Sequence, residues 1–447
     1  MKDECHKDEG RTHVMGGAVE FDRQKCIACK ACVVSCDRID VKFLELKEDG
    51  YQRHVDFTCN PGIDCIYCGQ CTFLCPVDAI HEYRQIDAVE AVINDPDKIT
   101  IVQMAPSTRA SIGEAFDQLP GTNVEGKMYT ALRMLGFDHI FDINMGADIT
   151  TYTEAMELAE RIQGKGPLPM FTSCCPAWVK FVEFYYPEMI PYLTTARSPH
   201  MHSGGAYKTW WAEKQGIHPK KIKVISIVPC TSKKYEATLD KFKINGVPPV
   251  DMVLTVREAA QLIKKHGIDL MNLEEGKVDS FGEYSGAAAI YGSSGGVMES
   301  ALRSAQYFLT GEDLEKIEFE DVRGMEGVKK ATVEIACRKL NVAVVNRTKN
   351  ATLLIKEVRR NPDAYHYVEV MACPGGCVGG GGQPSNHPKA IDERRKALYK
   401  IDDKAVVRRA HQNLMVKEFF EEYLSKLPKD EASAIIHTDF RRRNKFE

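Results

Sequence analysis

Short apolar runs alternate with longer amphipathic stretches through residues 96–387. The runs ITIVQMAP (99–106) and KVISIVPC (223–230) are continuous and rich in β-branched residues, which is typical of strands buried on both faces of a sheet. Between them, TEAMELAERIQ (153–163) and VREAAQLIKKHG (256–267) carry apolar residues at helical spacing. This alternation predicts an α/β body.

The regions that flank the body have a different pattern. The first 18 residues are polar and reach Gly16-Gly17 before the first strand-like run, so we interpret them as a tail. Residues such as LMVKEFFEEYLSKL (414–427) near the other end are charged and helix-prone, and this last region is too short for a core of its own. The predicted parts are a tail (1–18), a front domain (19–95), the body (96–387) and a C-terminal segment that wraps the body (388–447).

Length and composition add limits to this picture. A chain of 447 residues exceeds one core, since domains hold roughly 100–200 residues. The net charge of −4 argues against a dedicated nucleic-acid binder. No apolar run approaches the roughly 18–20 residues that span a bilayer, and the polar start lacks the apolar region of a secretory signal. A cytoplasmic location is therefore predicted.

The 16 cysteines are the strongest feature of the composition, because many of them fall in two runs. Each run has the spacing C-x2-C-x2-C-x3-C, starting at Cys26 and at Cys65. Three thiolates of such a run hold three corners of a [4Fe-4S] cubane, and in two-cluster ferredoxins the fourth thiolate belongs to the other cluster. The predicted ligand sets are Cys26, Cys29, Cys32 and Cys75 for one cluster, and Cys65, Cys68, Cys71 and Cys36 for the other.

Zinc is the alternative reading of these runs, but zinc sites usually use two C-x2-C pairs. One departure from the ferredoxin pattern is Asp37, which stands where Pro usually follows the fourth cysteine. Cys59 lies outside the pattern and reads as a spare thiol. Cys5, with His6 and His13, could bind a metal, although such residues in a tail are more often solvated. Two adjacent clusters form a path for electrons, so we expect redox chemistry in the body.

Three further cysteine motifs occur in the body: TSCCPAW (172–178), VPCTSKKYE (228–236) and VEVMACPGGCVGGGGQP (368–384). They supply five thiols, one more than a cubane needs. Two of the motifs follow strand-like runs, and ligands of open α/β sheets bind where strands end. We expect the three loops to converge on one buried cofactor, with the glycines letting backbone approach it. A phosphate loop is the alternative for the glycines, but the Lys-Ser/Thr ending is missing.

These motifs closely resemble the three signature loops of [FeFe]-hydrogenases, in the same order. The resemblance extends to QMAPSTRASIGEAF (103–116), GEYSGAAAIYGSSGGVMESALRSA (282–305) and HTDF (437–440), and covers residues 20–447. It implies a two-lobed hydrogenase domain with the active site between the lobes. It also implies an H-cluster, which is a [4Fe-4S] cubane joined to a two-iron unit that carries CO, cyanide and an azadithiolate.

The resemblance assigns roles around that cofactor. Cys377 would bridge the cubane to the two-iron unit, Cys174 would exchange protons with the azadithiolate, and Lys233 would donate to a cyanide. The cubane ligands would be Cys175, Cys230, Cys373 and Cys377. The residues expected around the two-iron unit are Pro106 and Ser107, whose amides would cradle the other cyanide, with Met371, Tyr291, Val228 and Gln383.

A proton route is the other implication. Glu154, Glu157 and Arg161 share one face of a predicted helix, and taken alone they would be a solvated face with surface ion pairs. The resemblance instead implies the chain Cys174–Glu154–Ser198–Glu157–Arg161. A cysteine near its ordinary pKa of about 8.5 would suit such a relay.

Several positions depart from the family pattern or stand outside it. Val228 replaces Met, Tyr291 replaces Phe, Ala177 replaces Gly, and Thr194 replaces Ser while keeping the hydroxyl. His200 is either functional or a packed or surface residue. Cys337, in the alternating stretch VEIACRKL, is predicted to be a core residue, as are Trp178, Trp210 and Trp211.

The function implied is 2H⁺ + 2e⁻ ⇌ H₂. Electrons would pass through the two front clusters to ferredoxin or flavodoxin, and dedicated maturation proteins would build the two-iron unit. The alternatives within the resemblance are a hydrogen sensor, which tends to lose the residue at Cys174, and a hydrogenase-like iron–sulfur assembly protein, which typically lacks the thiol pair Cys174-Cys175. Neither nucleic acid nor a membrane span is expected.

Overall fold

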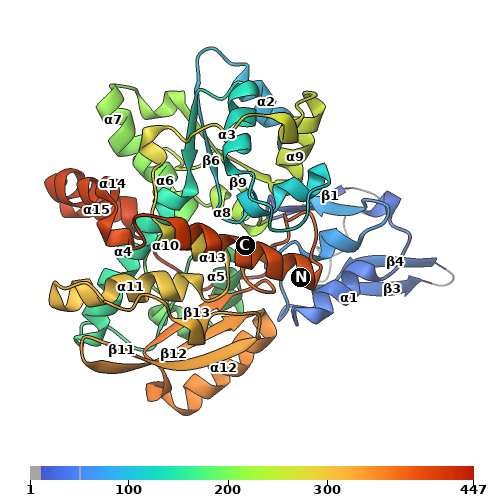
Figure 1. Ribbon diagram of the computed structural model, residues 1–447. Helices are drawn as coiled ribbons and strands as arrows, with labels where there is room; N and C mark the ends of the chain where they lie inside the picture. Colours follow the sequence, from blue (N-terminus) through green and yellow to red (C-terminus); the bar gives the residue numbers. More distant parts are fainter. Residues whose placement is uncertain (1–11, 50–51) are drawn as a thin grey trace.

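The computed structural model describes residues 12–49 and 52–447, so Cys5 and His6 of the predicted tail lie outside the described residues (Figure 1). The strands are β1 Thr12–Met15, β2 Val19–Asp22, β3 Leu44–Asp49, β4 Gln52–Phe57, β5 Ile80–Glu82, β6 Ile99–Met104, β7 His139–Asp142, β8 Met170–Phe171, β9 Ile222–Val228, β10 Met252–Thr255, β11 Val328–Ile335, β12 Arg338–Asn346 and β13 Tyr367–Met371.

The α-helices lie mostly in the body and the C-terminal segment. They are α1 Ala31–Arg38, α2 Ile86–Ile93, α3 Glu125–Met134, α4 Ile143–Ile162, α5 Pro176–Tyr185, α6 Pro199–Ala206, α7 Ala212–Gln215, α8 Ser232–Thr238, α9 Val256–Lys265, α10 Gly286–Ala289, α11 Gly296–Thr310, α12 Thr348–Arg360, α13 Pro388–Lys404, α14 Leu414–Glu418 and α15 Lys429–Ile436. The predicted α/β class with a small front domain is confirmed.

The upper lobe in Figure 1 is built on a parallel sheet in the order β10-β9-β6-β7. The strand residues Ile101, Val102, Val224 and Ile225 are completely buried, which explains the continuous apolar runs in the sequence. Helices α3 and α9 pack on one face of the sheet, and α6 packs on the other with Trp210 and Trp211. The prediction of these tryptophans as core residues is confirmed, as it is for Trp178.

The lower lobe is a second sheet in the order β11-β12-β13-β8, in which only the β11–β12 pair is antiparallel. Helix α12 covers one face and α11 the other (Figure 1). Cys337 is exposed, at a positive φ in the turn between β11 and β12. The prediction of a core residue was therefore wrong, because a turn interrupts the alternation that suggested one continuous strand.

The front domain lies to the right of both lobes in Figure 1. It has an antiparallel sheet in the order β1-β2-β5 and the hairpin β3-β4. The predicted tail was too long, because residues 12–15 form β1 and Gly16-Gly17, both at positive φ, turn the chain into β2. Phe21 and Phe43 share one apolar core with Trp178 and Val345 of the body, so the front domain is packed against the lower lobe.

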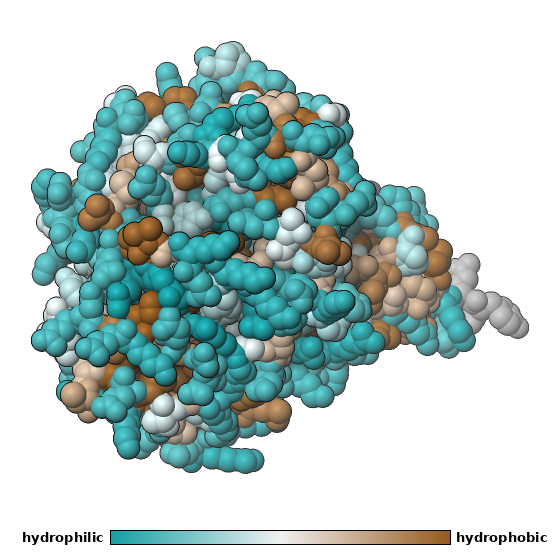
Figure 2. Space-filling view, viewed as in Figure 1, coloured by the Kyte–Doolittle hydropathy of each residue, from teal (hydrophilic) through white to brown (hydrophobic). Residues whose placement is uncertain are grey.

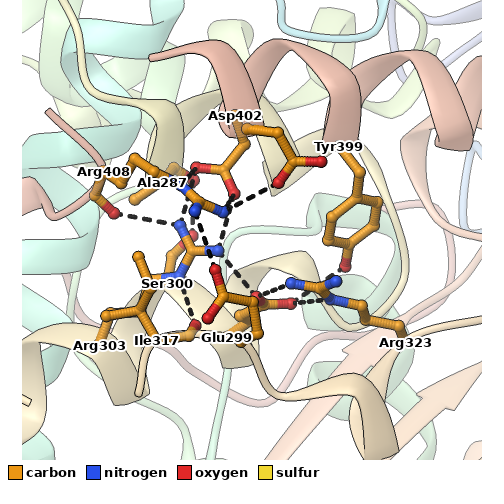
Figure 3. A network of polar contacts seen from close by, with 11 residues as sticks. Ala287, Glu299, Ser300, Arg303, Ile317, Arg323, Tyr399, Asp402 and Arg408 are labelled. Carbon is orange, nitrogen blue, oxygen red and sulfur yellow. Dashed lines mark hydrogen bonds and ion pairs between the residues drawn. The ribbon is translucent and has the colours of Figure 1, made fainter. Parts of the chain in front are cut away.

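Helix α13 crosses the molecule between the lobes and begins the C-terminal segment (Figure 1). A buried ion network ties it to α11 (Figure 3). The Arg303 guanidinium donates to both Asp402 oxygens at 2.9 and 2.8 Å and to Glu299 at 2.7 Å. Both ends of the Arg303–Asp402 pair are completely buried. Removing one partner of such a pair costs about 3–5 kcal/mol, so the network holds the C-terminal segment to the body.

The face of the molecule seen in Figure 2 is mostly hydrophilic, with apolar residues scattered among polar ones. Within the part of the chain that the structure describes, every helix is too short or too polar to cross a lipid bilayer.

Candidate active site

Four strands end at one cavity between the lobes. β6 and β9 of the upper sheet lead into residues 105–107 and 229–230, and β8 and β13 of the lower sheet lead into 172–175 and 372–373. Residues 105–107 and 228–230, with Cys174 and Met371, line a cavity together with Tyr291 and Cys377. Strand ends of α/β sheets are common ligand sites, and here two sheets direct their ends at each other.

The four thiols predicted to hold a cubane lie near one another, and two of them, Cys230 and Cys377, line this cavity. Besides burial, the nearby thiols of Cys230, Cys175 and Cys377 raise the pKa of Cys373. Burial and the Cys175 thiol likewise raise the pKa of Cys230 to about 12. Mutual electrostatic repulsion of this kind requires short separations, and it would favour a cationic iron centre that binds the thiolates together.

Cys174 is the fifth thiol of the cavity wall. Its side chain is 8% exposed. Burial, reinforced by the carboxylate of Glu154, raises the pKa of Cys174. The expectation of an ordinary cysteine pKa was wrong, because no water reaches enough of this thiol to stabilise the thiolate. In this environment the thiol holds its proton at neutral pH.

A buried cluster of charged and polar groups borders the other side of the cavity. The Lys233 ammonium donates to the Cys174 carbonyl at 3.1 Å and to Glu236 Oε2 at 2.9 Å. Glu236 Oε2 also lies 2.7 Å from His200 Nε2. Burial would raise the pKa of Glu236, but Lys233 and His200 outweigh it and lower the pKa to about 2. Lys233 thus remains a fixed positive charge beside the cavity, and His200 is a packed histidine.

The remaining wall of the cavity is largely apolar. Pro106, Ser107, Val228, Tyr291 and Met371 all line it. The extra hydroxyl of Tyr291 accepts a hydrogen bond from Thr151 at 2.9 Å, which holds the ring in place. An apolar wall excludes water, so charged groups in the cavity interact strongly.

Gln383 lies behind this wall. Its amide nitrogen donates to Ser107 Oγ at 3.3 Å and to the Cys377 carbonyl at 3.0 Å. It therefore joins two cavity loops instead of facing the cavity itself, where we had expected it. Its Oε1 is buried and makes no hydrogen bond to any described residue.

The glycines that follow Cys377 serve a purpose other than the predicted one. A Cβ on Gly381 would lie 2.1 Å from the Cys68 carbonyl oxygen, and one on Gly380 would lie 2.3 Å from that of Pro229. A Cβ on Gly379 would lie 2.1 Å from the carbonyl oxygen of Pro374. These glycines therefore let other backbone segments pack closely, and they bring the front domain against the cavity loops.

Glu154 lies on α4 and is completely buried, so the reading of a solvated helix face is wrong. Burial raises its pKa to about 8. The Tyr367 hydroxyl on β13 donates to Glu154 Oε1 at 2.8 Å, while Glu154 Oε2 is buried and has no partner among the described residues. Sequence reasoning missed Tyr367, because nothing in the strand pattern shows which side chain faces α4.

The hydroxyls next to Glu157 belong to Thr194 and Thr195. Thr194 Oγ1 donates to Glu157 Oε2 at 2.7 Å, and Arg161 donates to Glu157 Oε1 at 2.5 Å. Ser198 instead donates to Glu236 Oε2 at 2.9 Å. The prediction that placed Ser198 between the two glutamates is therefore corrected, because Ser198 begins helix α6 and faces the Lys233 cluster.

The two cysteine runs of the front domain adopt matching loops. Ala28 and Tyr67 occupy equivalent positions at φ 54° and 58°, as do Lys30 and Gly69 at 66° and 69°. These left-handed residues curl the backbone around each group of thiols. Backbone amides donate to sulfur, with Phe43 N 3.2 Å from Cys36 Sγ. Such bonds stabilise thiolates and tune cluster potentials.

Thiols of the two runs lie close enough to influence one another. Burial and the charges of Cys26, Cys75 and Cys29 raise the pKa of Cys32 to about 12. Burial and the charges of Cys68, Cys65 and Cys36 raise the pKa of Cys71. Cys59 is exposed and lies apart from both sets, with its sulfur 4.0 Å from Lys47 Nζ. Within residues 12–49 and 52–447, no three His, Cys, Asp or Glu side chains are grouped to hold a single metal ion.

The second run also reaches the cavity loops. Cys68 is close enough to Cys230 and Cys175 for their charges to raise its pKa, after burial. The Thr231 hydroxyl donates to the Tyr67 carbonyl at 2.6 Å, and Gln70 Nε2 donates to that of Gly379 at 2.8 Å. The thiol sets thus form a continuous series from the exposed Cys29 to the buried cavity.

The donor set fits iron–sulfur clusters. Thiols in groups of four, amides directed at sulfur and a dry cavity beside a fixed ammonium match the needs of such centres. The unpartnered Glu154 Oε2 fits a site where a proton is exchanged. Fold and site together define an iron–sulfur oxidoreductase whose inner centre lies between two lobes.

Comparisons with known proteins agree with this class. The chain matches the family described as iron only hydrogenase large subunit, C-terminal domain, over residues 98–381. It also matches iron hydrogenase small subunit over 388–443 and a 4Fe-4S dicluster domain over 25–79. The chain belongs to the iron-only, or [FeFe], hydrogenase family, and it is an oxidoreductase that handles H₂.

Individual relatives extend over most of the chain. It is 44% identical to iron hydrogenase 1 of Clostridium pasteurianum, over 95% of this chain and 76% of that protein. It is 42% identical to the periplasmic [Fe] hydrogenase large subunit of Nitratidesulfovibrio vulgaris, over 85% and 90%. A solved structure of the [FeFe]-hydrogenase HydA1 from Chlamydomonas reinhardtii matches with a TM-score of 0.72 and 35% identity, over 80% of this chain and 99% of that one.

A more distant relative bears on one alternative. The cytosolic iron-sulfur assembly component 3 of Pongo abelii is 28% identical over 90% of this chain and 88% of that protein. The lower identity favours the hydrogenases as the nearer group.

Proposed function

We propose that this protein interconverts H₂ with protons and electrons at an H-cluster in the cavity between the lobes. The observation that carries the proposal is the position of Cys174, a neutral buried thiol in the wall of a cavity that Cys230 and Cys377 also line. A thiol that binds no metal beside a metal site is an effective proton donor and acceptor.

The residues suited to the inner cubane are Cys175, Cys230, Cys373 and Cys377, with Cys377 at the cavity as the link to a two-iron unit. When bound, that unit supplies the redox-active iron at which H₂ forms or splits. The Lys233 ammonium would hold an anionic ligand at its wall, and amides near Pro106 and Ser107 would hold another. Val228, Met371 and Tyr291 exclude water from this space.

The proton route of the proposal runs from Cys174 to Glu154, then through Thr194 to Glu157 and Arg161. The contacts from Thr194 to Arg161 are direct hydrogen bonds. Glu154, with a pKa raised to about 8 by burial, can hold and release a proton near neutral pH. Ser198 stays outside this route.

The electron route of the proposal uses two [4Fe-4S] clusters in the front domain, with the two thiol sets described above. Cys29 and the neighbouring Ile27 are exposed, so an external carrier can approach the first cluster. Ferredoxin or flavodoxin is the proposed carrier, and maturation proteins are proposed to insert the two-iron unit. We keep the cytoplasm as the proposed location, because thiol clusters of this kind persist in a reducing compartment.

The sensor and assembly-protein alternatives receive less support. A sensor would not need Cys174, and an assembly protein would not need the adjacent thiols at 174 and 175. Cys174 lines the cavity, and Cys175 packs against the apolar cluster that contains Cys174, Tyr291 and Met371.

Infrared spectroscopy of protein matured with the two-iron unit tests the proposal, together with H₂ production from a reduced dye. Bands from CO and cyanide, with sustained turnover, are expected. Iron–sulfur protein that lacks these bands and makes no H₂ after maturation would contradict the proposal. Protein reconstituted with iron and sulfide alone is the matched control and should be inactive.

A further inference from the structure

The outer end of the proton route is joined to the C-terminal segment by a second hydroxyl. Glu157 Oε2 accepts from the Thr195 amide at 2.9 Å and from the Thr195 hydroxyl at 3.1 Å. That hydroxyl also lies 2.9 Å from His437 Nδ1. Residue 437 directly follows helix α15, so a part of the chain far from α4 in sequence reaches the relay through Thr195.

The chemistry of the three groups sets the direction of these hydrogen bonds. The Glu157 carboxylate is paired with Arg161 and only accepts. The hydroxyl hydrogen of Thr195 therefore goes to Glu157, and the Thr195 oxygen accepts from His437 Nδ1–H. The imidazole, the hydroxyl and the carboxylate thus form a directed chain in which each member can pass one proton to the next.

The same imidazole borders a surface cleft. Glu157, Glu160, Arg161, Lys165 and His437 line this cleft, which has a volume of about 840 Å³. The His437 ring is partly exposed, whereas Glu154 further inside is completely buried. The cleft is therefore where solvent comes nearest to the described relay, and His437 is a titratable group at that place.

The charges around His437 come from several elements. Burial lowers the pKa of His437, Arg197 lowers it further, and Glu157 and Glu160 oppose the change. Arg197 also holds the residue in place, because its Nε donates to the His437 carbonyl at 2.9 Å. Arg161 and Lys165 are the other charged groups of the cleft. The lowering influences therefore prevail over the two carboxylates, and the imidazole is a side chain that can accept and donate a proton.

We propose that His437 is the proton-exchange residue between solvent and Glu157, acting through the Thr195 hydroxyl. A solvent acid protonates Nε2, the Nδ1 proton passes to the Thr195 oxygen, and the Thr195 hydroxyl proton passes to Glu157. One proton enters, no electron moves, and the ring is left as the Nε2–H tautomer, which solvent exchange resets. The reverse order releases a proton. This role rests on the proposed function and gives the C-terminal segment a part in it.

The test compares His437→Gln and Thr195→Val with the parent enzyme and with His218→Gln, a control at an exposed site that caps a short 3-10 helix. H₂ production is measured against pH and buffer concentration. At low buffer concentration both variants are expected to lose about tenfold in rate, as for loss of a proton-transfer group. Added imidazole should restore His437→Gln but not Thr195→Val. His218→Gln should match the parent.

Two further measurements separate this role from a structural one. Infrared bands and iron content should be unchanged in His437→Gln. In unmatured protein, NMR titration of labelled histidine should show that Glu157→Gln lowers the pKa of His437, since it removes an opposing charge. If the parent is active and His437→Gln produces H₂ at the parental rate at every pH and buffer concentration, the role proposed for His437 is wrong and the proposed function is unaffected. An inactive parent would instead contradict the proposed function.

Discussion

The electron side and the proton side of the cavity are built in opposite ways. On the electron side, the backbone of a front-domain loop packs against the backbone of a cavity loop. A Cβ on Gly381 would lie 2.1 Å from the Cys68 carbonyl oxygen. On the proton side, α4 presents ionisable side chains toward the interior, and hydroxyls from other parts of the chain donate to Glu154 and Glu157. Glu154 and Arg161 are buried there at 0% and 6% exposure.

This difference follows from what each particle requires. An electron can cross closely packed protein without a series of donors and acceptors, so it is enough that glycines such as Gly381 let the front domain approach the cavity loops. A proton needs an unbroken series of donors and acceptors, so the protein must bury polar groups, which costs free energy unless each is paired. The unpartnered Glu154 Oε2 shows where that cost remains.

The largest effect is expected on the proton side, at Cys174. Cys174→Ala removes the thiol at the cavity wall while leaving the four thiols that suit the cubane. Turnover should fall by about 10²–10⁴-fold, as for loss of a general acid–base group, whereas iron content and infrared bands should persist. H₂ production with a reduced dye measures the rate, and a variant with parental turnover would remove Cys174 from the route.

Glu154→Gln should have the next largest effect, about a hundredfold loss of turnover, because the amide cannot release a proton. Stability provides an independent readout in the unmatured protein. The folded-state pKa of about 8 lies above the ordinary glutamate value of 4.5, so the native state binds more protons between these values and loses stability as pH rises through them. The melting temperature of the parent should therefore fall more steeply than that of Glu154→Gln. Equal slopes would mean that Glu154 is ionised in the fold.

The variants Thr194→Val and Ser198→Ala together test which of the two hydroxyls takes part in the proton route. Thr194 contacts Glu157 and Ser198 contacts Glu236, so only the first should slow turnover strongly, by about tenfold or more. The second should change it little. Thr194→Ser restores the hydroxyl and should recover the rate. A larger loss of turnover in Ser198→Ala than in Thr194→Val would mean that Ser198 belongs to the proton route.

The smallest effect is expected on the electron side, from Gly381→Ala. The added methyl would overlap the Cys68 carbonyl oxygen, and such overpacking typically costs about 1–3 kcal/mol. The melting temperature should drop, and turnover driven by a protein carrier should fall by a few fold. Gly62→Ala in an exposed turn is the control, with little change expected in either measurement. A Gly381→Ala variant with the melting temperature and turnover of the parent would show that this close contact is not needed.

Much of the site could be predicted because it depends on residues that lie close together in the sequence. In Cys26–Cys36 and Cys65–Cys75 the spacing of the thiols determines how a short loop folds around a cluster, so the two groups of neighbouring thiols could be read from sequence, and the crossed ligand sets stay a prediction. The strands before Cys230 and Cys373 could be recognised as apolar runs, and the ends of parallel strands lie together at one edge of a sheet. Asp37 stands where the ferredoxin pattern has proline, and Cys36 still lies close to Cys71 of the second run.

Other features could not be predicted because they depend on orientation. Thr194 and Ser198 are four residues apart in one connection, and only the packing of α6 shows which hydroxyl meets Glu157. The turn at Cys337 is hidden in a stretch that alternates like a strand. Tyr367 and His437 reach the relay from a strand and a terminal segment whose distance from α4 the sequence does not encode.

The sequence by itself determined the class of protein, the thiol sets and the strands that lead to them, since ligand spacing and hydrophobic period are local properties of a chain. Only the tertiary structure decided which carboxylates are buried, which hydroxyls contact Glu157 and which of these groups line a surface cleft. These depend on desolvation and on contacts between α4, the lower sheet and the C-terminal segment, and both are created only when distant parts of the chain pack together.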